Sequence, residues 1–233
     1  MRVQPFGVGS FVHVVKRGAR GLPITRDERD RERFMRLLYY LNDEYQSENW
    51  ELDVRYLKSL QWPKQWPEHR PLVKILAWTL MPNHFHLLLQ ETHDNGVSRF
   101  MQRLCGSMPR HFNEKYQEKG SIFQGSYRSR TIETDRYLRW AISYILVKNV
   151  FELYPSGFDR AVKEFEKAWK WGINSYPYSS LAGYARGNES PIISADVLEG
   201  FFRSQKDFKE CSRDMITSRL RNLAAVEEGI VFE

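Results

Sequence analysis

Two apolar segments separated by a short turn constrain the fold more than any other feature of the sequence. Leu72–Leu80 (LVKILAWTL) is typical of a buried strand, and His84–Thr92 (HFHLLLQET) predicts a second strand. Between them, Pro82 and Asn83 supply turn chemistry. The two strands are therefore predicted to form a hairpin.

The segments around this hairpin extend the pattern on both sides. Residues 9–18 predict a strand that ends in a glycine-rich turn, and residues 25–46 predict a helix with Thr25 or Asp27 as its cap. Beyond the hairpin, the sequence predicts a helix at 96–120, a strand at 126–133 and a helix at 134–152. Gly106 and Pro109 are potential breaks in the first of these helices.

The resulting order, β-α-β-β-α-β followed by a helix, is that of the split βαβ, ferredoxin-like arrangement. We therefore expect an α+β fold with an antiparallel sheet, helices on one face and a C-terminal helical extension. Residues 1–187 form the main domain, with a loop-rich insertion at about 49–71, and residues 188–233 form a helical tail. Trp62 and Trp66 are interpreted as packing residues of the insertion.

Composition narrows the class of protein without defining it. The formal net charge is +6 and the isoelectric point is about 9.3, which fits a polyanionic partner or simply a basic soluble enzyme. Cys105 and Cys211 are too few and too far apart for a disulfide framework or a thiolate zinc site. No apolar window long enough for a membrane span and no signal-peptide layout are found, so a cytoplasmic protein is expected.

Two histidines lie one residue apart at the start of the second hairpin strand. Residues i and i+2 of a strand point the same way, so His84 and His86 project from one face while Phe85 and Leu87 enter the core. Two such imidazoles can share one divalent cation and leave positions open for water or substrate. The alternative is a pair of histidines bonded to neighbours on a polar sheet face, and the spacing alone does not decide between them.

The sequence around this pair, MPNHFHLLLQ, resembles the HUH motif of the IS200-like, REP-associated tyrosine transposases, also called Y1 transposases. The resemblance extends over roughly Gly9 to Gly187. It includes FVHVVKRGARGLPI, RDERDRERFMRLL, GSIFQGSYRSRTIETDRYLRWAISYI and YPYSSLAGY, in the order typical of the family. The resemblance implies a ferredoxin-like fold, a divalent ion (Mg²⁺ or Mn²⁺), single-stranded or hairpin DNA as substrate, and a monomer or homodimer.

The family cuts single-stranded DNA with a tyrosine on the helix after the fourth strand and forms a 5′-phosphotyrosine intermediate. Its Y-I-x-x-N-P word matches YILVKN, which makes Tyr144 the expected nucleophile, whereas Tyr137 lies two turns earlier. The family usually places an Asn or Gln metal ligand four residues after the tyrosine. Here that position is Lys148 and the amide is Asn149, roughly 40° and 140° from Tyr144 on a regular helix.

Asn149 would therefore share the face of Tyr144 only if the helix bulges or ends there. Otherwise the protein has two histidine ligands and extra water, or it binds DNA without cutting it. A non-cutting nucleic-acid-binding protein of the same fold is accordingly the alternative function. A metal hydrolase that uses the histidines alone is less well supported, because no acid cluster accompanies them.

Cationic side chains near glycines and aromatic residues predict the DNA-binding surface. Phe123 and Tyr127 are candidates for stacking on unpaired bases, or alternatively belong to the core. The predicted DNA-contacting residues are Lys16, Arg17, Arg20, Arg128, Arg130 and Lys148.

Overall fold

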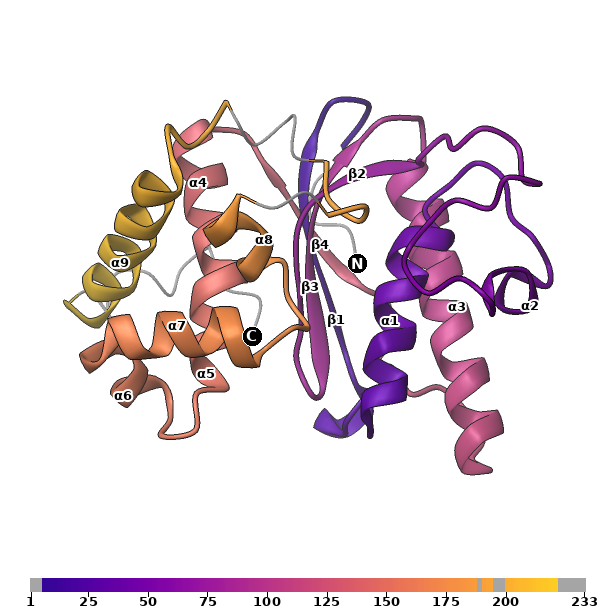
Figure 1. Ribbon diagram of the computed structural model, residues 1–233, viewed down its shortest axis with the longest axis horizontal. Coiled ribbons are helices and arrows are strands. Elements are labelled where there is room, and N and C mark those ends of the chain that lie inside the picture. Colours follow the sequence, from indigo (N-terminus) through magenta and orange to yellow (C-terminus); the bar gives the residue numbers. More distant parts are fainter. Residues whose placement is uncertain (1–5, 188–189, 195–199, 222–233) are drawn as a thin grey trace.

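A four-stranded antiparallel sheet lies at the centre of the molecule (Figure 1). The computed structural model describes residues 6–187, 190–194 and 200–221. The sheet has the order β2-β3-β1-β4, which is the ferredoxin-like order and confirms the predicted fold class. The strands are β1 (Phe11–Arg17), β2 (Val73–Leu80), β3 (His84–Glu91) and β4 (Arg128–Ile132).

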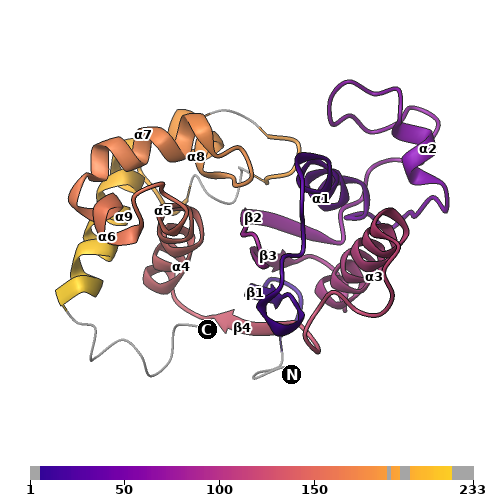
Figure 2. The same cartoon turned by 90° about the horizontal axis from the view of Figure 1, so that it is seen from below.

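Two long helices cover one face of the sheet, as the split βαβ order requires (Figure 2). The N-cap Asp27 accepts a hydrogen bond from the backbone N–H of Asp30, which explains where the first of them begins. The second helix continues through Gly106 and Pro109, so neither residue breaks it. The elements on this side are the short 3₁₀ turn η1 (Ala19–Gly21), α1 (Glu28–Tyr40), α2 (Trp50–Val54) and α3 (Gly96–Tyr116).

The predicted insertion carries α2 and otherwise consists of loops. Trp66 is buried and its ring lies 6.0 Å from that of Tyr40 and 4.9 Å from that of Trp62. These contacts confirm that both tryptophans pack the insertion against α1.

The opposite face of the sheet is covered by a second layer of helices (Figures 1 and 2). This layer begins directly after β4, and the last helix packs on α4. Part of the predicted tail, 188–189, 195–199 and 222–233, lies outside the described residues. The elements are α4 (Asp135–Ser143), η2 (Tyr144–Lys148), α5 (Asn149–Glu152), α6 (Phe158–Lys163), α7 (Phe165–Ser175), α8 (Leu181–Arg186) and α9 (Gln205–Arg221).

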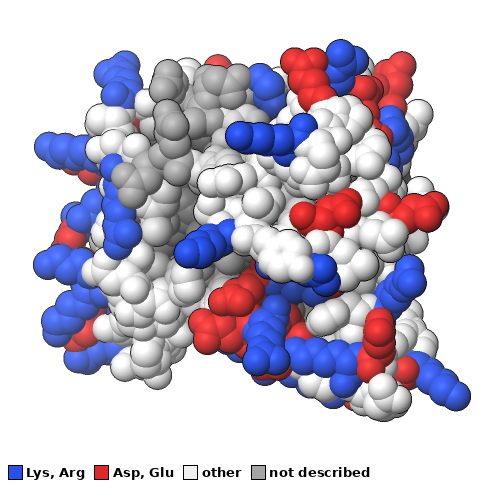
Figure 3. Space-filling model, turned by 45° about the vertical axis from the view of Figure 1, so that its right-hand side comes forward, with Lys and Arg blue, Asp and Glu red and all other residues white. Residues whose placement is uncertain are grey.

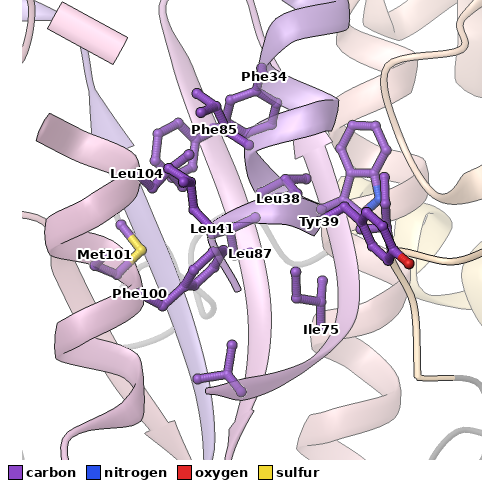
Figure 4. Close-up of a cluster of buried hydrophobic side chains, with 14 of the residues drawn as sticks. Phe34, Leu38, Tyr39, Leu41, Ile75, Phe85, Leu87, Phe100, Met101 and Leu104 are labelled. Atoms are coloured by element: carbon purple, nitrogen blue, oxygen red, sulfur yellow. The ribbon is translucent and has the colours of Figure 1, made fainter. Parts of the chain in front are cut away.

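Because strand residues alternate between faces, the sheet separates two apolar cores. Phe85 and Leu87 are fully buried with Phe34 on the α1–α3 side (Figure 4). Leu88, the next residue of β3, belongs instead to the core that includes Ile145. Among the described residues, no helix is long and apolar enough to cross a membrane.

Candidate active site

The two histidines of β3 lie on the sheet face that is covered by η2. Phe85 and Leu87 enter the other core, so His84 and His86 project side by side, with ring centroids 4.9 Å apart. Both line a cavity of about 150 Å³ together with Tyr144. The predicted side-by-side placement of the histidines is therefore confirmed.

The turn that precedes His84 is fixed by the loop after β1. The Gly18 N–H donates to the Asn83 carbonyl at 2.7 Å, and the Ile24 N–H donates to the Pro82 carbonyl at 2.9 Å. A Cβ on Gly18 would lie 2.2 Å from the Leu22 carbonyl oxygen, so only glycine fits. The glycine-rich loop thus holds the start of the histidine strand in place.

The helix that carries Tyr144 contains a π-helical turn at that residue. Within η2 the Asn149 N–H donates to the Tyr144 carbonyl, an i→i+5 hydrogen bond that replaces the usual i→i+4 one. The wider turn brings residue i+5 below residue i, and Tyr144 and Asn149 line the same cavity. The bulge that the sequence required for Asn149 to join Tyr144 is present.

The side chain of Asn149 is buried, with 1% of its surface exposed. Neither its Oδ1 nor its Nδ2 atom has a hydrogen-bond partner among the described residues. Buried polar atoms are rarely left unpaired, because each costs the free energy of losing its water. An amide of this kind that lines a cavity is suited to a ligand that enters the cavity.

Both histidines are held in the neutral form. Burial, followed by the charges of Arg17 and Lys148, lowers the pKa of His84 to about 4. Burial and the neighbouring His13 lower the pKa of His86 well below its ordinary value. Neutral imidazole is the form that binds a metal ion.

Lys148 also lies at the cavity, one helical position before Asn149. Its Nζ donates to the Tyr144 hydroxyl at 3.3 Å and lies 2.5 Å from Oε1 of Glu152. The ammonium group is thus placed to bind a negatively charged group beside the phenol oxygen. It has no lone pair and therefore cannot act as a metal ligand.

The cavity and its surroundings include residues that sequence reasoning missed. His13 is 2% exposed and bonds to His86, Glu152 lines the cavity, and the Trp140 ring stacks on Tyr144 with centroids 5.1 Å apart. His13 could have been found from the sequence. It lies four residues before Arg17, so the two side chains point to the same face of a strand that the ferredoxin-like order places beside β3. Tyr137, the alternative nucleophile, does not line the cavity.

The predicted DNA contacts divide between the two faces of the sheet. Arg17 is exposed and lines the cavity, and Arg128 and Arg130 pair with β1 on that same face. Arg20 is exposed in the loop after β1, with a positive φ of 57°. Arg130 lies over the Tyr137 ring at 5.5 Å.

Lys16 does not fit the predicted surface. It precedes Arg17 on the strand and therefore points to the α3 side, where it is 5% exposed. Its amino group donates to the Gly125 carbonyl and lies 4.9 Å over the ring of Phe123. Phe123 is itself buried in the core, which corrects its proposed role in base stacking.

On the α1–α3 side, Lys and Arg alternate with Asp and Glu rather than forming one positive area (Figure 3). Among the described residues, no three His, Cys, Asp or Glu side chains form a metal-binding group.

Residues 68–147 match the family described as "Transposase IS200 like". The matched segment includes His84, His86 and Tyr144 and ends before Lys148 and Asn149. The resemblance to the IS200-like transposases, which the sequence motifs indicate, is thereby confirmed over this segment.

One solved structure similar to this chain is described as "Structure of the REP associates tyrosine transposase bound to a REP hairpin". It shares 17% sequence identity and covers 84% of this chain and 92% of that chain, with a TM-score of 0.42. No relative was found among curated proteins.

Proposed function

We propose that this protein is a metal-dependent single-stranded DNA endonuclease and transposase that cuts beside hairpin DNA. The observation that carries the proposal is the π-helical turn, which gathers Tyr144 and Asn149 around one cavity with His84 and His86. Within the described part of the chain, the buried amide of Asn149 has no hydrogen-bond partner. The family match over residues 68–147 supports the same reaction class.

In this reaction the Tyr144 hydroxyl attacks the scissile phosphorus. A bond forms between Oη and phosphorus as the hydroxyl loses its proton to solvent. The bond from phosphorus to the 3′ oxygen breaks, and the leaving oxygen takes up a proton from solvent. The product is a 5′-phosphotyrosine and a free 3′-hydroxyl. Because the phosphodiester bond energy is conserved in the tyrosine link, a 3′-hydroxyl can later attack it and complete strand transfer.

The residues present fit a divalent ion such as Mg²⁺ or Mn²⁺. His84, His86 and the Oδ1 atom of Asn149 would hold it, since these are two neutral imidazoles and a carbonyl oxygen that no other described residue binds. The ion would polarise the scissile phosphate and stabilise the negative charge that develops on its oxygens.

Arg17 and Lys148 supply the cationic groups of the same cavity. An arginine binds phosphate through parallel hydrogen bonds. The Lys148 ammonium group lies beside the Tyr144 oxygen and stabilises negative charge that develops there. These side chains therefore orient the DNA backbone at the nucleophile.

Cleavage of a 5′-extended single-stranded hairpin with Mn²⁺ tests the proposal. Wild type is expected to cut and to form a denaturation-resistant adduct. Tyr144→Phe is expected to bind the DNA without either product, because only a hydroxyl is lost and the ring keeps its stacking on Trp140.

A second candidate, a non-cutting DNA-binding protein, is favoured by one observation: Lys148 occupies the position of the family's third ligand and pairs with Glu152. Wild type that binds hairpin DNA but forms no adduct with any divalent ion would support this candidate and refute the first.

A further inference from the structure

Each histidine of the cavity has one ring nitrogen engaged by a neighbour outside the metal-binding set. The Nδ1 atom of His84 lies 2.7 Å from Oδ1 of Asn83. The Nδ2 group of Asn83 donates to the Gly21 carbonyl at 3.2 Å. Since the amide nitrogen is the donor to Gly21, its oxygen is the acceptor, and Nδ1 of His84 must carry the hydrogen. In a neutral ring this leaves the lone pair on Nε2.

His86 has an equivalent contact from a different strand. Its Nδ1 atom lies 3.0 Å from Nε2 of His13, and the two rings stack at 24° with centroids 5.2 Å apart. Each of these side chains is 2% exposed. Because two N–H groups cannot point at each other across a hydrogen bond of this length, a single hydrogen lies between the two nitrogens.

The position of that hydrogen decides what His86 presents to the cavity. If Nδ1 of His86 carries it, Nε2 of His86 offers a lone pair to a cation. If Nε2 of His13 carries it, His86 presents an N–H group, which cannot bind a metal ion. At His84 the hydrogen is placed on Nδ1 by the contact with Asn83.

We propose that Asn83 and His13 are positioning residues that hold His84 and His86 in the same Nδ1–H form, so that both Nε2 lone pairs are available to one divalent cation. The inference rests on the proposed function for the identity of the cation. Hydrogen bonds of this kind orient ligand histidines and typically change metal affinity by about 10–100-fold when removed.

Nuclear magnetic resonance of the metal-free protein tests the proposal without any reaction. With ¹⁵N-labelled histidine, six side chains must be assigned. His84 and His86 are both expected in the Nδ1–H form. A hydrogen on Nε2 of His86 would overturn the assignment to His13.

Metal affinity supplies the second readout, with Mn²⁺ as the probe in calorimetry. His13→Leu removes the acceptor and should weaken binding about 10–100-fold, whereas His13→Gln can still accept through its side-chain oxygen and should bind within a few-fold of wild type. Asn83→Leu, which lies at a turn outside the core, should weaken Mn²⁺ binding similarly. His93→Leu, an exposed histidine at the far end of the sheet, should bind as wild type.

The outcomes separate this inference from the proposed function. Equal Mn²⁺ affinity of wild type, folded His13→Leu and Asn83→Leu would refute the positioning role even if the enzyme cuts DNA. Wild type that neither binds Mn²⁺ nor cuts DNA would refute the proposed function. The inference would still be tested by nuclear magnetic resonance, which shows whether His86 has the Nδ1–H form in wild type and loses it in His13→Leu.

Discussion

Replacing Asn149 by leucine should stabilise the metal-free protein while reducing the stabilisation that it gains from metal. The two side chains have the same number of heavy atoms and the same branching. Neither polar atom of Asn149 has a partner among the described residues, and an unsatisfied buried polar group costs about 1–3 kcal/mol. Asn149→Leu should therefore raise the free energy of unfolding by about 1–3 kcal/mol, which corresponds to about 2–12 °C in Tm for a chain of this size.

Thermal unfolding followed by circular dichroism, first with a chelator and then with Mn²⁺, measures both effects. Wild type should gain stability on adding Mn²⁺, because a ligand that binds only the folded state shifts the equilibrium toward it. Asn149→Leu should gain much less. The variant would then be the more stable protein without metal and the less responsive one with it.

Asn42 provides a matched control on the other side of the sheet. Its amide is also buried, but it donates to the Val73 carbonyl at 2.8 Å and accepts from the Val73 N–H at 3.1 Å. Asn42→Leu should therefore destabilise the fold by at least about 1–3 kcal/mol. Destabilisation of the metal-free protein by Asn149→Leu as well would show that Asn149 has a partner in solution and refute the reasoning.

Two further predictions concern the DNA surface and the loop after β1. Replacing Arg17, Arg128 and Arg130 together by alanine should reduce the slope of log affinity for single-stranded DNA against log salt by about 2. Lys16→Met should leave this slope unchanged. The reverse result would show that Lys16 contacts DNA and that the three arginines do not. Gly18→Ala should destabilise the fold by about 1–3 kcal/mol in urea unfolding, because its Cβ would meet the Leu22 carbonyl, whereas Gly7→Ala, with nothing within 4 Å, should be nearly neutral. Equal stability of the two alanine variants would show that the loop adjusts freely.

The parts of the molecule that depend on local periodicity could be predicted from the sequence. The hairpin, the order of strands and helices and the shared face of His84 and His86 all follow from strand alternation and turn residues. The position of Lys16 followed from the same alternation, since adjacent strand residues point to opposite faces. Its location on the face opposite Arg17 could therefore have been predicted from the sequence.

The remaining features depend on contacts between distant segments or on backbone bonding that periodicity does not encode. The π-helical turn changes which residue lies below Tyr144, and the sequence showed only that a bulge was needed for Asn149. The contact of His13 with His86 depends on the register between β1 and β3, which pairs Val15 with His86 and brings His13 diagonally next to it. The helices on the second face of the sheet come after the βαβ unit, so their placement depends on contacts between helices, such as those of α4 with α9.

Identification of the DNA-linked residue tests the central claim most directly. The adduct formed by wild type with hairpin DNA and Mn²⁺ would be digested by protease and nuclease, and the modified peptide sequenced by mass spectrometry. The account predicts a 5′-phosphate ester on Tyr144, the tyrosine that lines the cavity with His84 and His86. A phosphate ester on Tyr137, or a linkage through a 3′-phosphate, would contradict it.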